Sequence, residues 1–219
     1  MQLIGFFVDA GWDVSGLQAL SIFETANAVL AERRYACRLL SHEGGTLKAT
    51  NGVELLTRPL AQCYMDTLFL THACASACLW SNVADDLFEA CWAARRVAAS
   101  SEGTFALAEL GLLDDRRVVT HHSDTAEFRR RFPSVDSSTR TDVLVDKSIW
   151  TSAIETHGVD MAMRLIQRDA GIEVAREVAG RTLIAHCGPG GHVENARPHD
   201  RSLEIEFETE RVMMATLRR

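Results

Sequence analysis

Short apolar runs alternate along this chain with longer segments of helical periodicity, and this alternation constrains the fold more than any other feature. Leu3–Val8 and Thr67–Thr71 are continuous apolar runs, which is typical of strands that are covered on both faces of a sheet. Leu17–Leu30 carries its apolar residues at helical spacing. Further strands are expected near residues 36–40, 97–99, 117–120, 143–145 and 149–152, and further helices near 83–94, 104–110, 125–132, 156–169 and 172–185. The pattern predicts an α/β fold in three layers, with a mostly parallel sheet of about six or seven strands and helices on both faces.

Local turn signals refine this outline. Asn51-Gly52 lies between two extended runs, so we expect an inserted β-hairpin over residues 46–56. Gly111 directly follows a helical run and is expected to end it. Ser123 and Asp124 precede another helical run, where short polar side chains typically cap the first turn.

Composition indicates a soluble cytoplasmic protein. The 219 residues are 47% hydrophobic and 24% charged, which suits one globular domain. The N-terminal stretch "MQLIGFFVDAGW" has no basic region before its apolar run, so it is read as a core strand and not as a signal peptide. No apolar run is long enough to span a membrane. The six cysteines have irregular spacings and are expected to be reduced thiols.

The charge distribution argues against direct nucleic-acid binding by this chain. The net charge is −7, and no cluster of Lys and Arg could displace the counterions of a duplex.

The main domain is expected to span residues 1–191. Residues 192–219 contain many turn-forming residues and then alternate apolar with acidic residues, so they are read as a linker plus a short strand or arm, or else as a poorly ordered terminus.

One short string suggests a site. In "AASSEGTF", residues 98–105, a small residue, Ser101 and Gly103 have the spacing of a nucleophile elbow, between a predicted strand and a predicted helix. A side chain on such a strained corner is exposed at the carboxyl edge of the sheet, where doubly wound folds bind their ligands. Ser101 is therefore the first candidate site residue.

Three strings carry a resemblance to a known family. They are "DVSGLQALSIFETAN" after the first strand, "SSEGTFALAELGLLDDRRVVTHH" around the elbow, and "IWTSAIETHGVDMAMRLI" near the end of the domain. With them the chain resembles the ThiJ/PfpI (class I glutamine amidotransferase-like) superfamily over residues 3–191. It is most similar to the N-terminal effector domains of AraC/XylS-type transcription regulators and to isonitrile hydratases. The resemblance implies a flavodoxin-like fold and a homodimer.

The resemblance also assigns the site. Catalytic members have a cysteine at the elbow, an acidic residue after the first strand and often a histidine after the strand that follows the elbow. Those positions are Ser101, Asp13 and His121 in this chain. A ligand pocket built on these loops would be lined by Asp13, His72, Ser101, Glu102 and His121. No cofactor and no metal ion are expected, because His72, Cys74 and Cys78 make only a weak metal-ligand pattern.

The residue types favour ligand binding over catalysis. A serine attacks only when an oriented base takes its proton, and no carboxylate that could orient His121 is evident, since Asp124 is expected to cap a helix. His72-Ala73-Cys74 also stands where catalytic relatives have a glycine-rich turn that supplies backbone donors. The predicted function is therefore a regulatory domain that binds a small polar molecule. The alternative is a serine-dependent hydrolase or an isonitrile-hydratase-like enzyme that uses Ser101, Asp13 and His121.

The AraC-type regulators carry two helix-turn-helix motifs after this domain. Only 28 residues follow Gly191 here, which is too short for that pair, so we expect either that the chain is a truncated or stand-alone relative or that DNA recognition resides elsewhere.

Overall fold

The computed structural model describes residues 1–9, 12, 17–70, 80–100, 102–138, 141–153 and 158–186. The chain divides into a compact unit of Met1–Thr182 and a second unit of Leu183–Arg219. The fold described below is that of the first unit, and the predicted domain boundary at residue 191 lies outside the described residues.

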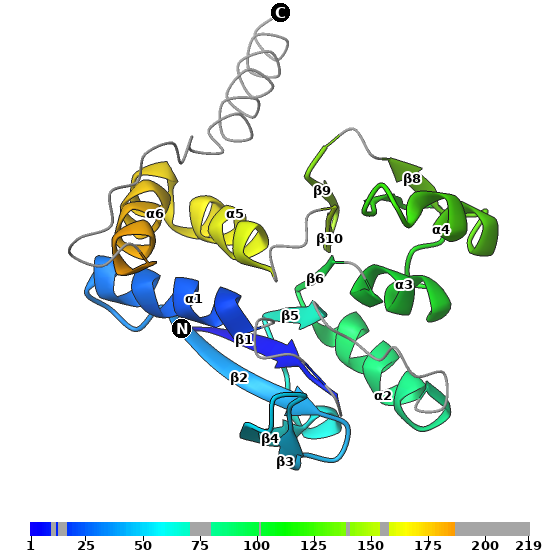
Figure 1. Cartoon of the computed structure of the whole chain (residues 1–219), viewed down its shortest axis with the longest axis horizontal. Helices are drawn as coiled ribbons and strands as arrows, with labels where there is room; N and C mark the ends of the chain where they lie inside the picture. The colour runs from blue at the N-terminus through cyan, green and yellow to red at the C-terminus, as the bar shows by residue number, and fades with distance from the viewer. Residues whose placement is uncertain are drawn as a thin grey trace, which may run out of the picture. The chain divides into compact units, whose positions relative to one another are not determined.

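Most of the described strands form one twisted sheet of eight strands (Figure 1). Its order is β3-β4-β2-β1-β5-β6-β10-β9, and its central strands β2, β1, β5, β6 and β10 are parallel. The strands are β1 (Gln2–Phe7), β2 (Tyr35–Ser41), β3 (Gly45–Lys48), β4 (Glu54–Pro59), β5 (Thr67–Leu70), β6 (Arg96–Ser100), β9 (Val143–Asp146) and β10 (Ile149–Ser152). The strand order reverses between β1 and β5, as in flavodoxin-like folds.

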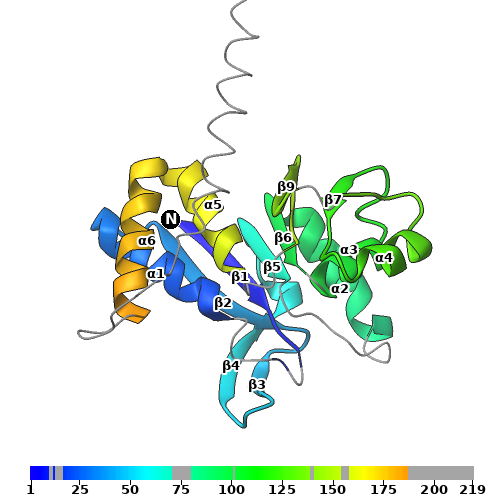
Figure 2. The same ribbon diagram turned by 45° about the horizontal axis from the view of Figure 1, so that its top comes forward.

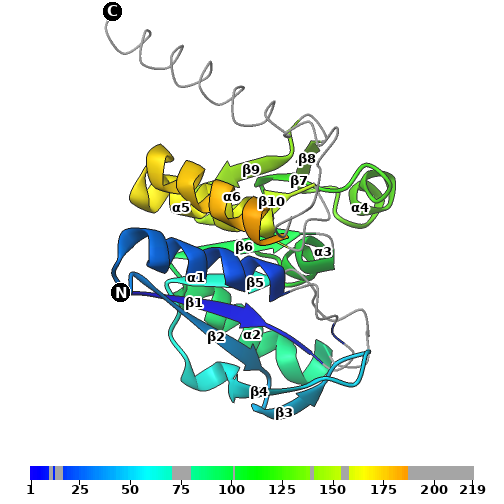
Figure 3. The same cartoon turned by 60° about the vertical axis from the view of Figure 1, so that its left-hand side comes forward.

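Helices cover both faces of this sheet, as Figures 2 and 3 show. One face carries α1 (Gln18–Leu30), α5 (Val159–Ala170) and α6 (Ile172–His186), and the other carries α2 (Trp80–Ala93) and α3 (Glu102–Glu109). A further helix, α4 (Thr125–Arg131), packs beyond α3, and a short 3₁₀ helix spans Leu60–Gln62. The predicted three-layer α/β fold is thus confirmed. None of the helices in the described part of the chain is long and apolar enough to cross a bilayer.

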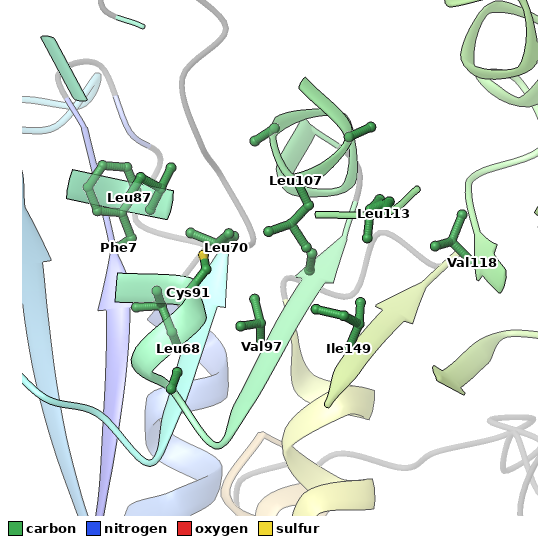
Figure 4. Close-up of a cluster of buried hydrophobic side chains, with 14 of the residues drawn as sticks. Phe7, Leu68, Leu70, Leu87, Cys91, Val97, Leu107, Leu113, Val118 and Ile149 are labelled. Carbon is green, nitrogen blue, oxygen red and sulfur yellow. The ribbon is translucent and has the colours of Figure 1, made fainter. Parts of the chain in front are cut away.

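The central strands are largely apolar because alternate residues enter two different cores. Phe7, Leu70 and Val97 point into the layer that contains α2 and α3, and Figure 4 shows them around Leu107 and Leu87. Their neighbours along the strands enter the opposite core, which contains α1, α5 and α6; these include Ile4, Phe6, Phe69 and Ala98. The continuous apolar runs of the sequence therefore reflect burial on both faces.

Two of the three predicted local signals, the hairpin turn and the end of α3 at Gly111, are confirmed. β3 and β4 form the expected antiparallel hairpin, with Asn51 and Gly52 in its turn and Gly52 at φ +89°. β4 also pairs with β2, so the hairpin extends the sheet to eight strands, where about six or seven were expected. Gly111, at φ +71°, ends α3 in a Schellman motif: its N–H bonds to Ala108 O, and Leu112 N–H bonds to Leu107 O.

One predicted strand lies outside the main sheet. β7 (Arg117–Val119) pairs in parallel with β8 (Asp136–Ser138), a strand that periodicity did not reveal, in a separate two-stranded sheet. β8 has only three residues, and so short a run carries too little pattern to be recognised.

Candidate functional site

The carboxyl ends of four parallel strands meet at one edge of the sheet. β1 ends at Phe7, β5 at Leu70, β6 at Ser100 and β10 at Ser152. Doubly wound folds bind ligands at this edge, close to the point where the strand order reverses. Here that point lies between β1 and β5.

Three of the five predicted site residues follow these strand ends in the sequence. Asp13 follows β1, His72 follows β5 and Ser101 follows β6. All three lie outside the described residues, so their predicted roles and the predicted backbone conformation of Ser101 stay predictions. Glu102 and His121 belong to the described part of the chain.

The corner after β6 is short and tightly packed. β6 ends at Ser100 and α3 begins at Glu102, so one residue position separates strand from helix. A Cβ atom added to Gly103 would lie 1.6 Å from the carbonyl oxygen of Leu70, the last residue of β5. The backbone of the first turn of α3 therefore packs directly on the backbone at the end of β5, and only a glycine permits this close approach. This contact explains the glycine of the Ser-x-Gly pattern.

Glu102 is the first residue of α3 and is exposed. A carboxylate at this position interacts favourably with the partial positive charge of the helix N-terminus. In the described structure its side chain is available to solvent, and its predicted contact with a ligand stays a prediction.

Two buried polar atoms near this edge have no hydrogen-bond partner within the described chain. Thr104, in the first turn of α3, is 0% exposed, and its hydroxyl is unpaired. Trp12, which directly precedes Asp13, is 3% exposed, and its indole N–H is unpaired. An unpaired buried polar group costs about 1–3 kcal/mol, so each such group in a folded protein calls for a partner. Sequence reasoning missed both residues, since nothing in their local pattern signals an unpaired atom.

His121 lies beyond the carboxyl end of β7, which runs in the same direction as β10. Val119 N–H donates to Thr151 Oγ1 over 2.9 Å, and Arg117 N–H donates to Asp146 Oδ2 over 2.9 Å. Asp146 pairs with Ile149, the first residue of β10. The start of β7 therefore lies beside the start of β10, and the end of β7 lies beside the end of β10. His121, which comes after β7 in the chain, accordingly belongs to the same edge of the sheet as the end of β10.

The predicted cap of α4 is wrong, and the correction concerns His121. Asp124 occupies the N-cap position, but its side chain makes no capping hydrogen bond. Its Oδ1 accepts instead from Ser123 Oγ over 2.6 Å, and Ser123 Oγ lies 2.8 Å from His121 Nδ1. A carboxylate is therefore linked to His121 through one hydroxyl, although none was evident from the sequence.

The backbone holds this turn in place. Asp124 N–H and Thr125 Oγ1 both donate to His121 O over 3.0 Å, and Thr125 Oγ1 also lies 3.1 Å from Thr120 Oγ1. The ring of His122 packs beside that of His121, with ring centroids 4.2 Å apart.

Two cysteines of the described part, the half-buried Cys37 and the buried Cys91, are unsuited to nucleophilic chemistry. Burial raises the pKa of the Cys91 thiol to about 12. Burial, and secondarily the charge of Glu24, raise that of Cys37 to about 12 as well. Neither thiol is poised to ionise as a nucleophile near neutral pH. Among the described side chains no three His, Cys, Asp or Glu residues lie close enough to hold a metal ion, and His72, Cys74 and Cys78 lie outside them.

Known proteins resemble this chain in sequence and in fold. No family model matches the chain. The chain is 26% identical over 189 residues to the HTH-type transcriptional regulator GbdR of two Pseudomonas aeruginosa strains, an alignment that covers 81% of this chain and 49% of the regulator. It therefore spans about half the length of the curated relatives it matches.

Two solved structures illustrate the likeness. An AraC family transcriptional regulator from Pseudomonas putida aligns with a TM-score of 0.70 at 19% identity and covers 83% of this chain and 100% of its own. DJ-1beta from Drosophila melanogaster aligns with a TM-score of 0.67 at 18% identity, over 84% of this chain and 98% of its own. The predicted resemblance is confirmed at the level of fold: the chain has the ThiJ/PfpI-like fold of AraC-family regulator structures and DJ-1 proteins.

Proposed function

We propose that this chain is the ligand-binding domain of an AraC-type transcription regulator, in which Ser101 replaces the elbow cysteine and has no catalytic role. The similarity to GbdR and to the Pseudomonas putida regulator supports the regulator assignment. In this proposal the chain binds a small polar molecule at the carboxyl edge of the sheet and forms a homodimer. DNA recognition is assigned to a helix-turn-helix segment outside these residues, because the net charge of −7 disfavours binding to a duplex.

The unpaired hydroxyl of Thr104 is the observation that carries the binding assignment. It is fully buried, it belongs to the first turn of the helix that follows position 101, and it has no partner in the described chain. The unbound protein bears the cost of desolvating this hydroxyl. A bound polar molecule would supply the missing hydrogen bond, so the cost is recovered only in the complex.

Thr104→Val tests this reasoning because valine keeps the shape and removes the hydroxyl. The variant should be more stable than wild type by about 1 kcal/mol, since no hydrogen bond is lost. In a domain of this size that is a rise of about 2–4 °C in the melting temperature. A thermal-shift panel of amino acids, hydroxy acids and alkylamines supplies the binding readout, and we expect any compound that stabilises wild type to bind the variant about tenfold more weakly.

Thr151→Val is the matched control. Its hydroxyl is also buried but accepts a hydrogen bond from Val119 N–H, so this variant should lose about 1–3 kcal/mol. Destabilisation of Thr104→Val to the same extent would mean that Thr104 already has a partner, and would refute the binding argument.

The alternative is an enzyme that uses Ser101, Asp13 and His121. The link from Asp124 through Ser123 to His121 favours this alternative, because it provides the oriented base that a serine nucleophile requires. His72-Ala73-Cys74, in place of a glycine-rich turn, counts against it, because loss of an oxyanion donor costs about 3–4 kcal/mol of transition-state stabilisation. Fluorophosphonate probes, activated esters and isonitriles should give neither labelling nor turnover. Labelling at residue 101, or turnover that Ser101→Ala abolishes, would establish the enzyme instead.

A further inference from the structure

The positions of the protons in the turn 121–124 follow from its distances. The Asp124 carboxylate can only accept, and its Oδ1 lies 2.6 Å from Ser123 Oγ. The single hydroxyl proton of Ser123 is therefore directed at Asp124. Ser123 Oγ is then left to accept, and its other neighbour, His121 Nδ1, lies 2.8 Å away. His121 Nδ1 must carry the proton of that hydrogen bond.

A second, weaker contact of His121 Nδ1 would require the opposite protonation state of that nitrogen. Ser123 N–H approaches His121 Nδ1 over 3.4 Å, which would require a bare Nδ1. That arrangement would also place two lone pairs against each other across the 2.8 Å contact between Nδ1 and Ser123 Oγ. The shorter hydrogen bonds from Nδ1 to Ser123 and from Ser123 to the charged carboxylate of Asp124 are stronger, so they determine which ring nitrogen carries the proton.

This assignment leaves the other ring nitrogen as an acceptor. A neutral imidazole that carries its proton on Nδ1 has a bare Nε2. Neutral histidine in water favours the opposite tautomer, so the chain through Ser123 to Asp124 selects the less common form. His121 is half-buried, its backbone carbonyl is held by two hydrogen bonds, and no partner of Nε2 occurs among the described residues.

We propose that Asp124, through Ser123, is a positioning residue that fixes His121 in the Nδ1–H tautomer, so that Nε2 accepts a hydrogen bond from an O–H or N–H group of the bound molecule. The role in binding rests on the proposed function; the tautomer does not. The class of ligand is thereby narrowed to small molecules with a hydroxyl or a protonated amine.

The tautomer is tested first, on the full chain labelled with ¹⁵N-histidine. Long-range ¹H–¹⁵N correlation spectra distinguish a protonated ring nitrogen from a bare one, and loss of the signals in His121→Gln assigns them. In the neutral imidazole of wild-type His121 we expect a bare Nε2. Ser123→Ala should restore the Nε2–H form as the major tautomer, and Asp124→Asn should shift the ratio in the same direction.

Ser134→Ala is the matched control for the Ser123 variant. Ser134 Oγ donates to Asp114 Oδ1 over 2.6 Å, which is the same exposed Ser–Asp contact without a histidine. This variant should leave the His121 tautomer unchanged. A wild-type Nε2–H form, or a tautomer that Ser123→Ala does not alter, overturns the positioning role whatever the protein binds.

The binding role is tested with simple probes. Methylammonium has N–H donors, and tetramethylammonium has the same charge and none. Titration with methylammonium should move the His121 Nε2 resonance of wild type, and Ser123→Ala should weaken that response several-fold. Tetramethylammonium should leave the resonance in place. Ethylene glycol is a second probe, with hydroxyl donors. Equal responses to the two cations would overturn the acceptor role, and so would the absence of a response to methylammonium or to ethylene glycol. The tautomer result would stand in each case.

Discussion

A buried ion pair at the amino edge of the sheet gives the sharpest test of how this fold is held together. Arg96, at the start of β6, donates from Nη1 to Asp169 Oδ1 over 2.8 Å and from Nη2 to Asp169 Oδ2 over 2.7 Å. The same guanidinium also donates to Gln2 Oε1 and to Thr67 Oγ1, the latter from Nε. Asp169 lies in the last turn of α5, so the pair ties this helix to β1, β5 and β6.

The burial of both charges sets the expected magnitude. The side chains of Arg96 and Asp169 are 6% and 8% exposed, so the screening that weakens surface pairs does not apply. Arg96→Met leaves both carboxylate oxygens of Asp169 without their partner, and loss of one member of a buried pair costs about 3–5 kcal/mol. Asp169→Leu leaves the guanidinium with two neutral acceptors and should cost about 3 kcal/mol. The double variant removes both charges and should cost less than either single variant, because no charge is left uncompensated.

Urea unfolding of the four proteins measures this cycle. With a slope of about 2 kcal/mol/M, a loss of 3 kcal/mol lowers the midpoint by about 1.5 M. The reasoning requires a coupling of about 3 kcal/mol or more between the two sites. Single variants that cost less than 1 kcal/mol, or a double variant that costs the sum of the two, would show that the pair behaves like an exposed one.

Two further predictions concern packing and ionisation. Gly103→Ala should destabilise the fold by about 1–3 kcal/mol or more, because the new methyl meets the backbone of β5 and no rotamer can relieve the clash. Gly180→Ala, on an open face of α6, should stabilise it by about 0.5–1 kcal/mol, and equal melting temperatures for the two variants would contradict the contact described above. Burial raises the pKa values of Cys37, Cys91 and Tyr35 to about 12, so these groups ionise first in the unfolded chain. The stability that the three neutral groups contribute should therefore be fully present below pH 9 and should be lost between pH 9 and 12. Tyr35→Phe should flatten the part of this decline above pH 10, and urea midpoints that stay constant across the range would refute the assignment.

Much of the fold was predictable from the sequence because local signals agreed with one another. Continuous apolar runs predicted strands buried on both faces, Asn51-Gly52 predicted the hairpin, and Gly111 predicted the end of α3. Each of these features depends on residues that are near neighbours in the chain, where propensity and periodicity act directly.

The elbow glycine was recognised from its spacing, but the reason for it is tertiary. Gly103 is required by the carbonyl oxygen of Leu70, which is more than thirty residues away in the sequence. The short strand β8 and its pairing with β7 depend in the same way on a partner distant in sequence.

The described site features were decided by the tertiary structure. Ser123 and Asp124 have the composition of a helix cap, and their sequence cannot show that Asp124 turns instead toward a hydroxyl that contacts His121. Thr104 reads as an ordinary residue of a helix, and only packing reveals that its hydroxyl is buried without a partner. The sequence determines most of the helices and strands, because their secondary structure follows from local periodicity; the short strand β8 is an exception. Burial is decided only when distant segments meet, and the hydrogen-bond partners of side chains, even of the near neighbours His121, Ser123 and Asp124, depend on three-dimensional geometry that no local pattern encodes.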